Sequence, residues 1–240
     1  MFTYLIYYIL GIVLIPGIIL GIYAQFKVKR TYSNYSQIPS KSGWTAAQVA
    51  RNILDNAGLT DIELRHINGS LTDHYHPKQR YIGLSSDIYD SNSVAALGIA
   101  MHEVGHALQD KEKYGFLKLR QFMVPVTNIA STLLWPLVII GLLLGFGSST
   151  GGMFADICIY AGVGFFGLSV LLNLITLPVE FDASRRALAL LEQGNILDTE
   201  ELAQTKKVLS AAALTYVAAF VVSILEFLRF LLLIFITRNE

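Results

Sequence analysis

One stretch of the chain combines a helical pattern with a metal-binding motif: Ser93-Val-Ala-Ala-Leu-Gly-Ile-Ala-Met-His-Glu-Val-Gly-His-Ala-Leu-Gln-Asp110. It lies in a polar part of the chain and follows a segment with extended character. Its residues predict a helix from Ser93 to about Asp110, capped at its start by Asp90, Ser91 or Asn92. The remaining segments can be placed around this helix.

The motif within the stretch is His102-Glu-Val-Gly-His106. Side chains four residues apart on a helix share one face, at roughly 5–6 Å between Cβ atoms, so His102 and His106 can bind one Zn²⁺. Glu103 lies beside them and can accept a proton from a water that the metal activates. Gly105 costs about 1 kcal/mol in a helix relative to alanine, so we expect another segment to pack closely against this turn.

The polar segment 25–123 that contains this motif predicts a small α+β domain. Its other elements are a helix that opens with a capping box at Thr45–Gln48 and stops at Gly58, strands at Asp61–Ile67 and Arg80–Ser85, and a histidine-rich loop at Leu71–Pro77. We expect Arg80–Ser85 to be an edge strand, on which a substrate peptide can pair in extended form.

The composition of the whole chain indicates a membrane protein. Of its 240 residues 53% are hydrophobic and only 15% are charged, and the apolar residues gather in blocks of spanning length, which excludes a soluble enzyme. The 18 basic and 18 acidic residues cancel, which argues against a nucleic-acid partner. We predict a mainly α protein with four transmembrane helices within residues 1–24, 124–147, 157–179 and 208–237, and with the small domain between the first and second.

The basic residues predict how the chain lies in the lipid bilayer. Twelve of the 18 lie in segment 25–123 and four in the short polar segment that includes 180–207. Since basic residues accumulate on the cytoplasmic side, we expect a multi-pass protein of the cytoplasmic membrane with both polar segments inside and both termini outside.

A catalytic zinc usually has three protein ligands and one open position, so a third ligand must come from elsewhere. The second polar segment offers Glu180 and Asp182, and the predicted topology places both on the same side of the membrane as His102. Either carboxylate suits zinc, and Asp182 could instead orient a ligating histidine.

The histidine-rich loop offers candidates for a second role. His74, Tyr75 and His76 could stabilise the negative charge that develops on the substrate carbonyl, and we single out His74 as the catalytic candidate. Asp73 is expected to turn the loop, and His66 to be structural.

Several motifs together resemble the YugP-type bacterial membrane zinc metallopeptidases: Leu71-Thr-Asp-His-Tyr75, His102-Glu-Val-Gly-His-Ala-Leu-Gln109, Pro178-Val-Glu-Phe-Asp-Ala-Ser184 and Ala211-Ala-Ala-Leu-Thr-Tyr-Val-Ala218. The chain is also similar to the Ste24/HtpX-like membrane gluzincins, in which a Glu-x-x-x-Asp motif supplies the third ligand. The resemblance implies a zincin-like catalytic domain with Glu180 as that ligand. Ser184 stands where that class has aspartate.

These observations predict a zinc-dependent endopeptidase that cleaves membrane proteins or peptides at the cytoplasmic face. Zn²⁺ would be held by His102, His106 and Glu180, with Glu103 as general base. The alternative is a non-catalytic zinc-binding scaffold, but a structural site would close the fourth position with another protein ligand and needs no base. The sequence predicts neither the oligomeric state nor accessory proteins.

Overall fold

The computed structural model describes residues 11–145 and 152–238, which form two compact units. We call them the polar unit, made of Tyr23–Lys118 and Leu177–Thr215, and the apolar unit, made of the described parts of Met1–Ile22, Leu119–Thr176 and Tyr216–Glu240.

Four long helices supply most of the structure: α2 (Ile15–Tyr35), α5 (Gly115–Gly145), α6 (Gly152–Gln193) and α7 (Thr199–Arg238). Among the described residues, three helical segments are long and apolar enough to cross a membrane: Gly115–Gly141, Gly152–Gln193 and Thr199–Leu232. Large apolar side chains such as Phe122, Trp135 and Ile129 are exposed on them, as expected for surfaces that face lipid. The first predicted span falls partly on residues 2–10, outside the described part.

The helices α6 and α7 are longer than the sequence predicted. We expected the chain to leave the membrane at Pro178 and to start a new helix there. Instead α6 continues through Pro178 to Gln193. A proline inside a helix costs about 3 kcal/mol, but the next turns are buried: Val179, Ala183 and Ala187 have no exposed surface. Tertiary packing therefore outweighs the local preference, and Glu180 lies in the middle of a helix.

The predicted helices of the polar unit are present. α3 (Ala46–Asn56) opens with the expected capping box, in which the Thr45 hydroxyl accepts from Gln48 N–H and the Gln48 side chain accepts from Thr45 N–H. α4 (Val94–Lys111) is the motif helix. Its N-cap is Ser93 itself, whose hydroxyl accepts from Ala96 N–H, and not one of the three residues before it.

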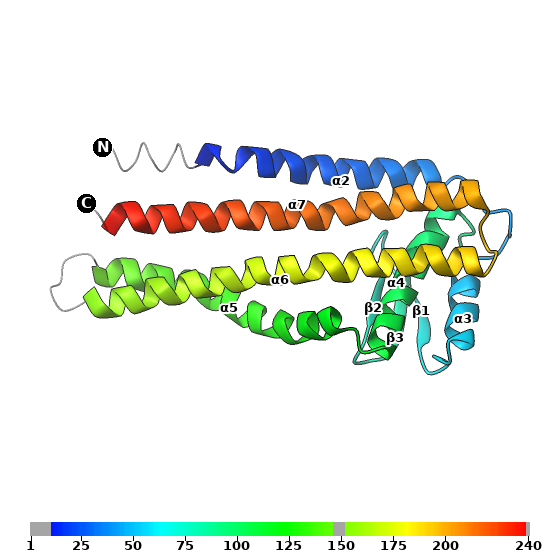
Figure 1. The fold of residues 1–240 in the computed structure, drawn as a ribbon, viewed down its shortest axis with the longest axis horizontal. Coiled ribbons are helices and arrows are strands. Elements are labelled where there is room, and N and C mark those ends of the chain that lie inside the picture. The colour runs from blue at the N-terminus through cyan, green and yellow to red at the C-terminus, as the bar shows by residue number, and fades with distance from the viewer. Residues whose placement is uncertain (1–10, 146–151, 239–240) are drawn as a thin grey trace. The chain divides into compact units, whose positions relative to one another are not determined.

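A small sheet lies beside α4 (Figure 1). Its strands are β1 (Glu63–Ile67), β2 (His74–His76) and β3 (Tyr81–Ser85), in the order β1-β3-β2, with β1 parallel and β2 antiparallel to β3. The sequence had predicted only a loop where β2 lies. The prediction that residues 80–85 form an edge strand is wrong, since β3 is central and buries Ile82 and Leu84 completely.

The core of the polar unit forms where α4 packs against α3 and against the strands β2 and β3. Its largest fully buried side chains include Leu54, Ile62, Ile82, Leu84, Leu97 and Met101. Burial of apolar surface is favourable by roughly 25 cal/mol per Å², so these side chains stabilise the packing of α4.

The expected close contact at Gly105 is confirmed. A Cβ built on Gly105 would lie 2.7 Å from the carbonyl oxygen and 3.2 Å from the Cα of Ala183, which belongs to α6. The backbones of α4 and α6 therefore approach each other at the turn between the two motif histidines.

We predict that Gly105→Ala lowers the free energy of unfolding by about 1–3 kcal/mol, because the new methyl group meets rigid backbone and must push α4 away from α6. Thermal unfolding of the protein in detergent measures this change. Gly21→Ala is the matched control, since a Cβ on this helical glycine of α2 meets nothing within 4 Å. A Gly105→Ala variant that unfolds at or above the wild-type temperature would contradict the prediction.

Candidate metal centre

Three side chains of the polar unit converge on one point. His102 Nε2 lies 3.2 Å and His106 Nε2 lies 3.7 Å from the same oxygen, Glu180 Oε2. The two imidazole rings are 4.7 Å apart between centroids and nearly perpendicular. The ligand atoms of all three residues lie within 4.8 Å of one another. The structure thus brings together two histidines of α4 and a carboxylate that follows 74 residues later on α6.

This arrangement fits Zn²⁺. Zinc binds imidazole nitrogen and carboxylate oxygen at about 2.0–2.2 Å in a tetrahedron, which separates neighbouring ligand atoms by roughly 3.3 Å. The two observed nitrogen–oxygen distances lie on either side of that value. Glu180 is only 2% exposed, and a buried carboxylate needs a compensating positive charge. A zinc ion bound among these three side chains would supply it.

The Nδ1 atom of each histidine contacts a residue to which the sequence analysis gave no role. His106 Nδ1 donates to the Gln109 side-chain oxygen over 2.9 Å, and His102 Nδ1 lies 3.1 Å from the Ser184 hydroxyl. Hydrogen bonds at this position orient metal-binding histidines. The spacing could have indicated Gln109, since it lies one turn beyond His106 on the same face of α4.

The carboxylate of Glu180 also changes the proton affinity of its neighbour. Burial alone would lower the pKa of the His106 imidazole, but the hydrogen bond to Glu180 and the negative charges of Glu103 and Glu180 raise it above its usual value. The negative charges thus favour a positive charge at this position, which is the charge that a metal ion would bring.

Glu103 belongs to α4, and its carboxylate contacts the edge strand β2. It is 8% exposed, and its Oε2 accepts the backbone N–H of Tyr75 over 2.9 Å. The carboxylate is therefore held by β2, in the turn of α4 that carries both histidines. This is a suitable position for a base that acts on a group bound at the histidines.

The side chains of the histidine-rich segment are engaged with other residues. His74 Nδ1 lies 3.0 Å from Thr72 O, and its Nε2 lies 3.0 Å from the Tyr81 hydroxyl. The His76 ring stacks on Tyr81, and the Tyr75 hydroxyl donates to Asp110. The structure does not bring these three side chains to the histidine pair of α4, so the role predicted for His74 stays a prediction.

Asp73 and His66 have the kinds of contact expected of structural residues. Asp73 accepts from both the backbone N–H and the hydroxyl of Ser85, and burial raises the pKa of this carboxyl despite those hydrogen bonds. The His66 ring packs against Tyr89, with the ring centroids 5.1 Å apart.

Asp182 is buried but belongs to a different set of contacts. Its oxygens accept from the Gln109 amide over 2.9 Å and from the guanidinium groups of Arg185 and Arg186. It is thus linked to His106 through Gln109 instead of contacting a histidine directly. Arg186 in turn pairs with Glu112, which lowers the pKa of that carboxyl.

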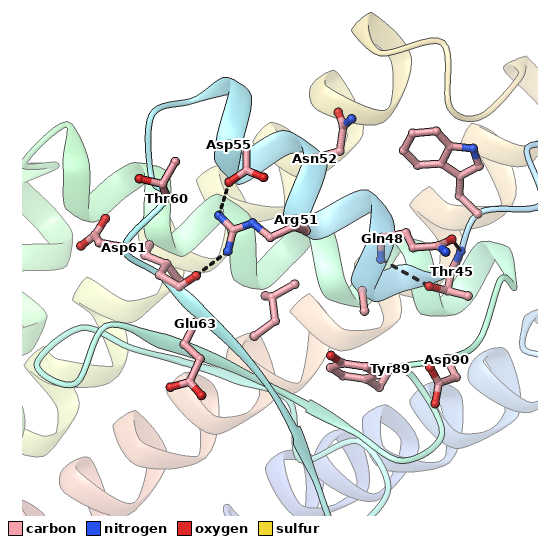
Figure 2. Close-up of a pocket in the computed structure, with 14 residues that line it drawn as sticks. Thr45, Gln48, Arg51, Asn52, Asp55, Thr60, Asp61, Glu63, Tyr89 and Asp90 are labelled. Atoms are coloured by element: carbon pink, nitrogen blue, oxygen red, sulfur yellow. Dashed lines mark hydrogen bonds and ion pairs between the residues drawn. The ribbon is translucent and has the colours of Figure 1, made fainter.

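A large open groove lies elsewhere on the polar unit, between α3 and β1 (Figure 2). It has a volume of about 1060 Å³, and its lining includes Trp44, Arg51 and Tyr89. Three of its carboxylates, those of Asp55, Asp61 and Glu63, are each paired with an arginine. None of the three converging side chains lines it, so it is separate from the candidate metal centre.

Comparison with known proteins gives two matches. A family model described as "Putative neutral zinc metallopeptidase" matches residues 10–235. The chain is also 44% identical over 221 residues to a protein of Bacillus subtilis (strain 168) named "Putative membrane protease YugP", which covers 92% of this chain and 94% of that protein. No solved structure matches the chain.

The contacts predict different effects for the two carboxylates of α6. Glu180→Ala removes an atom that lies beside both histidines, so we expect zinc affinity to fall by more than the roughly 10–100-fold typical of outer contacts. Asp182→Ala removes only the partner of Gln109 and the arginines, so we expect the loss to stay within that range. Zinc content of the two purified variants after dialysis against a weak chelator measures this. If Asp182→Ala empties the site and Glu180→Ala does not, the ligand assignment is wrong.

Proposed function

Because the chain belongs to the YugP-like family of neutral zinc metallopeptidases, we propose that it is a membrane-embedded endopeptidase in which His102, His106 and Glu180 bind Zn²⁺. The observation that carries this proposal is the convergence of the two Nε2 atoms on one buried carboxylate oxygen, with Glu103 held in the same turn of α4. Family membership indicates the chemistry, and the convergence of these side chains supports the proposed ligands.

When bound, zinc would polarise the scissile carbonyl and make a water molecule acidic enough to lose a proton near neutral pH. Glu103 would accept that proton and later donate it to the departing amine. Before a substrate binds, the hydrogen bond from the Tyr75 N–H orients this carboxylate without neutralising its charge. His102 and His106 keep their Nε2 atoms directed inward, because their Nδ1 atoms are engaged by Ser184 and Gln109.

The position of β2 supports an extended substrate. β2 is an edge strand, and the Tyr75 N–H points away from β3, since it donates to Glu103 on α4. The outer edge of β2 thus faces the helix that carries the motif. We propose that a substrate peptide pairs with this edge and accepts the hydrogen bond of the Tyr75 N–H in place of Glu103. The Glu103 carboxylate is then free to act as base.

The membrane setting rests on three apolar helices of spanning length and on the name of the relative, a membrane protease. We propose four spans, the first of them within residues 1–24, and a zincin-like catalytic domain on the cytoplasmic side with both termini outside. Peptide substrates follow from protease chemistry. For an enzyme with helices of spanning length, we expect these substrates to be membrane proteins, or peptides that reach the cytoplasmic surface of the bilayer.

The alternative function is a non-catalytic scaffold with a structural zinc. Such a site normally has four protein ligands, whereas the group within bonding range in the described residues has three. It also has no use for a buried carboxylate such as Glu103. The scaffold predicts zinc binding without cleavage, so activity of Glu103 variants distinguishes the two functions.

We predict that Glu103→Gln retains about one zinc per chain and loses peptide cleavage by 10²-fold or more, the usual contribution of a general base. Glutamine has the same shape and can still accept from the Tyr75 N–H through its oxygen, so the fold is preserved. The measurement is cleavage of a fluorogenic peptide library by both proteins at equal zinc content. Near wild-type cleavage by Glu103→Gln would show that another group is the base.

We predict that a cysteine at Lys78, an exposed residue between β2 and β3, is labelled by a membrane-impermeant maleimide only when the cytoplasmic side is opened. The native Cys158 is first replaced by alanine. Met153→Cys, at the exposed start of α6 and expected outside, is the matched control and should react in intact cells. The reverse pattern would refute the proposed orientation.

A further inference from the structure

We propose that Gln109 is a positioning residue of the metal centre. Its side-chain amide selects the zinc-binding nitrogen of His106 and links the segment around Glu180 to α4. The inference rests on the zinc site proposed above and adds a residue outside the ligand set. Gln109 has no exposed surface, and its amide makes three hydrogen bonds of 2.9 Å, to His106 Nδ1, Val179 O and Asp182 Oδ2.

These three partners fix the orientation of the amide. Val179 O is a backbone carbonyl and Asp182 Oδ2 belongs to a carboxylate that also binds Arg186, so both atoms are acceptors. The amide nitrogen of Gln109 must therefore face α6 and donate both of its hydrogens there. Its oxygen is left to face His106.

The orientation of the amide decides the tautomer of His106. An amide oxygen can only accept, so His106 Nδ1 must carry a hydrogen. A neutral imidazole has one N–H, and its other nitrogen then has a free lone pair. That nitrogen is Nε2, which lies 3.7 Å from Glu180 Oε2. Gln109 thereby prepares the ring to bind zinc through Nε2.

The same amide also holds the third ligand in place. Val179 directly precedes Glu180 and Asp182 follows it by two residues, so the hydrogen bonds from Gln109 lie on both sides of the ligand. One side chain therefore links the helix of the histidines to the helix of the carboxylate. Its loss would leave buried hydrogen-bonding groups of His106, Val179 and Asp182 without this partner.

His102 provides an internal comparison. Its Nδ1 lies 3.1 Å from the Ser184 hydroxyl, which can either donate or accept, so this contact does not by itself select a tautomer. Removal of Gln109 should thus change the environment of His106 Nδ1 and leave that of His102 Nδ1 in place. A general loosening of the fold would affect both histidines.

The test uses the full-length protein in detergent, labelled with ¹⁵N-histidine and loaded with zinc. Zinc affinity is measured by competition with a chromogenic chelator, and the Nδ1–H signals of the metal-bound histidines are those that shift on zinc loading. Gln109→Met keeps the length of the side chain but removes its donors and its oxygen. Zinc on Nε2 leaves a hydrogen on Nδ1 in every variant, so the readout is the hydrogen bond that this Nδ1–H makes. In Gln109→Met we expect the His106 Nδ1–H signal to lose its downfield, hydrogen-bonded shift, the His102 signal to keep its own shift, and zinc to bind about 10–100-fold more weakly.

Two further variants complete the design. Gln193→Met, an exposed position at the end of α6, is the matched control and should bind zinc like the wild type. If Gln109→Met does not fold, Gln109→Asn replaces it. Asparagine keeps the amide but is one methylene shorter, so it cannot reach from His106 to α6 and should show the same losses.

Retention of the downfield shift of the His106 Nδ1–H signal, or of wild-type zinc affinity, in the folded Gln109 variant would overturn this inference while leaving the zinc site intact. Failure of the wild-type protein to bind zinc would instead overturn the proposed metal centre, and the role of Gln109 with it.

Discussion

The close approach of α4 and α6 at Gly105 is the constraint on which the candidate metal centre depends. Ala183 O would lie 2.7 Å from a side-chain carbon at this position, so only glycine allows the two backbones to come this near. His102 and His106 flank Gly105 on the same face of α4, and Glu180 lies one turn before Ala183 on α6. At the ordinary interaxial distance of 8–10 Å between packed helices, Glu180 would lie further from the two histidines. The contact between these two helices therefore brings together residues that are far apart in the sequence.

Burial of polar groups is the cost of this arrangement, and the surrounding contacts offset it. Glu180 and Gln109 are almost inaccessible to water, and each side chain is hydrogen-bonded to residues of the other helix or lies beside the histidines. Removing a polar group from water without a partner costs several kcal/mol, so the centre is stable only when it is complete. A zinc ion would add the charge that the buried carboxylate requires. Metal binding and stability of the polar unit are therefore expected to rise together.

The sequence predicted the features that depend on local patterns. Residue spacing revealed the histidine pair of α4, the capping box at Thr45 revealed α3, and a glycine inside a helix revealed the contact at Gly105. Features that depend on distant partners were not predicted. β2 has only three residues in a polar stretch, and pairing with β3 stabilises it. α6 continues through Pro178 because of its packing, and Gln109 acquires a role only from Val179 and Asp182. Glu180 was found because the predicted topology and the family resemblance both pointed to it.

X-ray absorption spectroscopy at the zinc edge of the purified wild-type protein tests most directly whether His102, His106 and Glu180 hold the metal. The expected spectrum is that of one zinc per chain with two imidazole ligands and the remaining ligands oxygen, all at about 2.0–2.2 Å. A spectrum with sulfur at about 2.3 Å, or with three or more imidazoles, would contradict this ligand set.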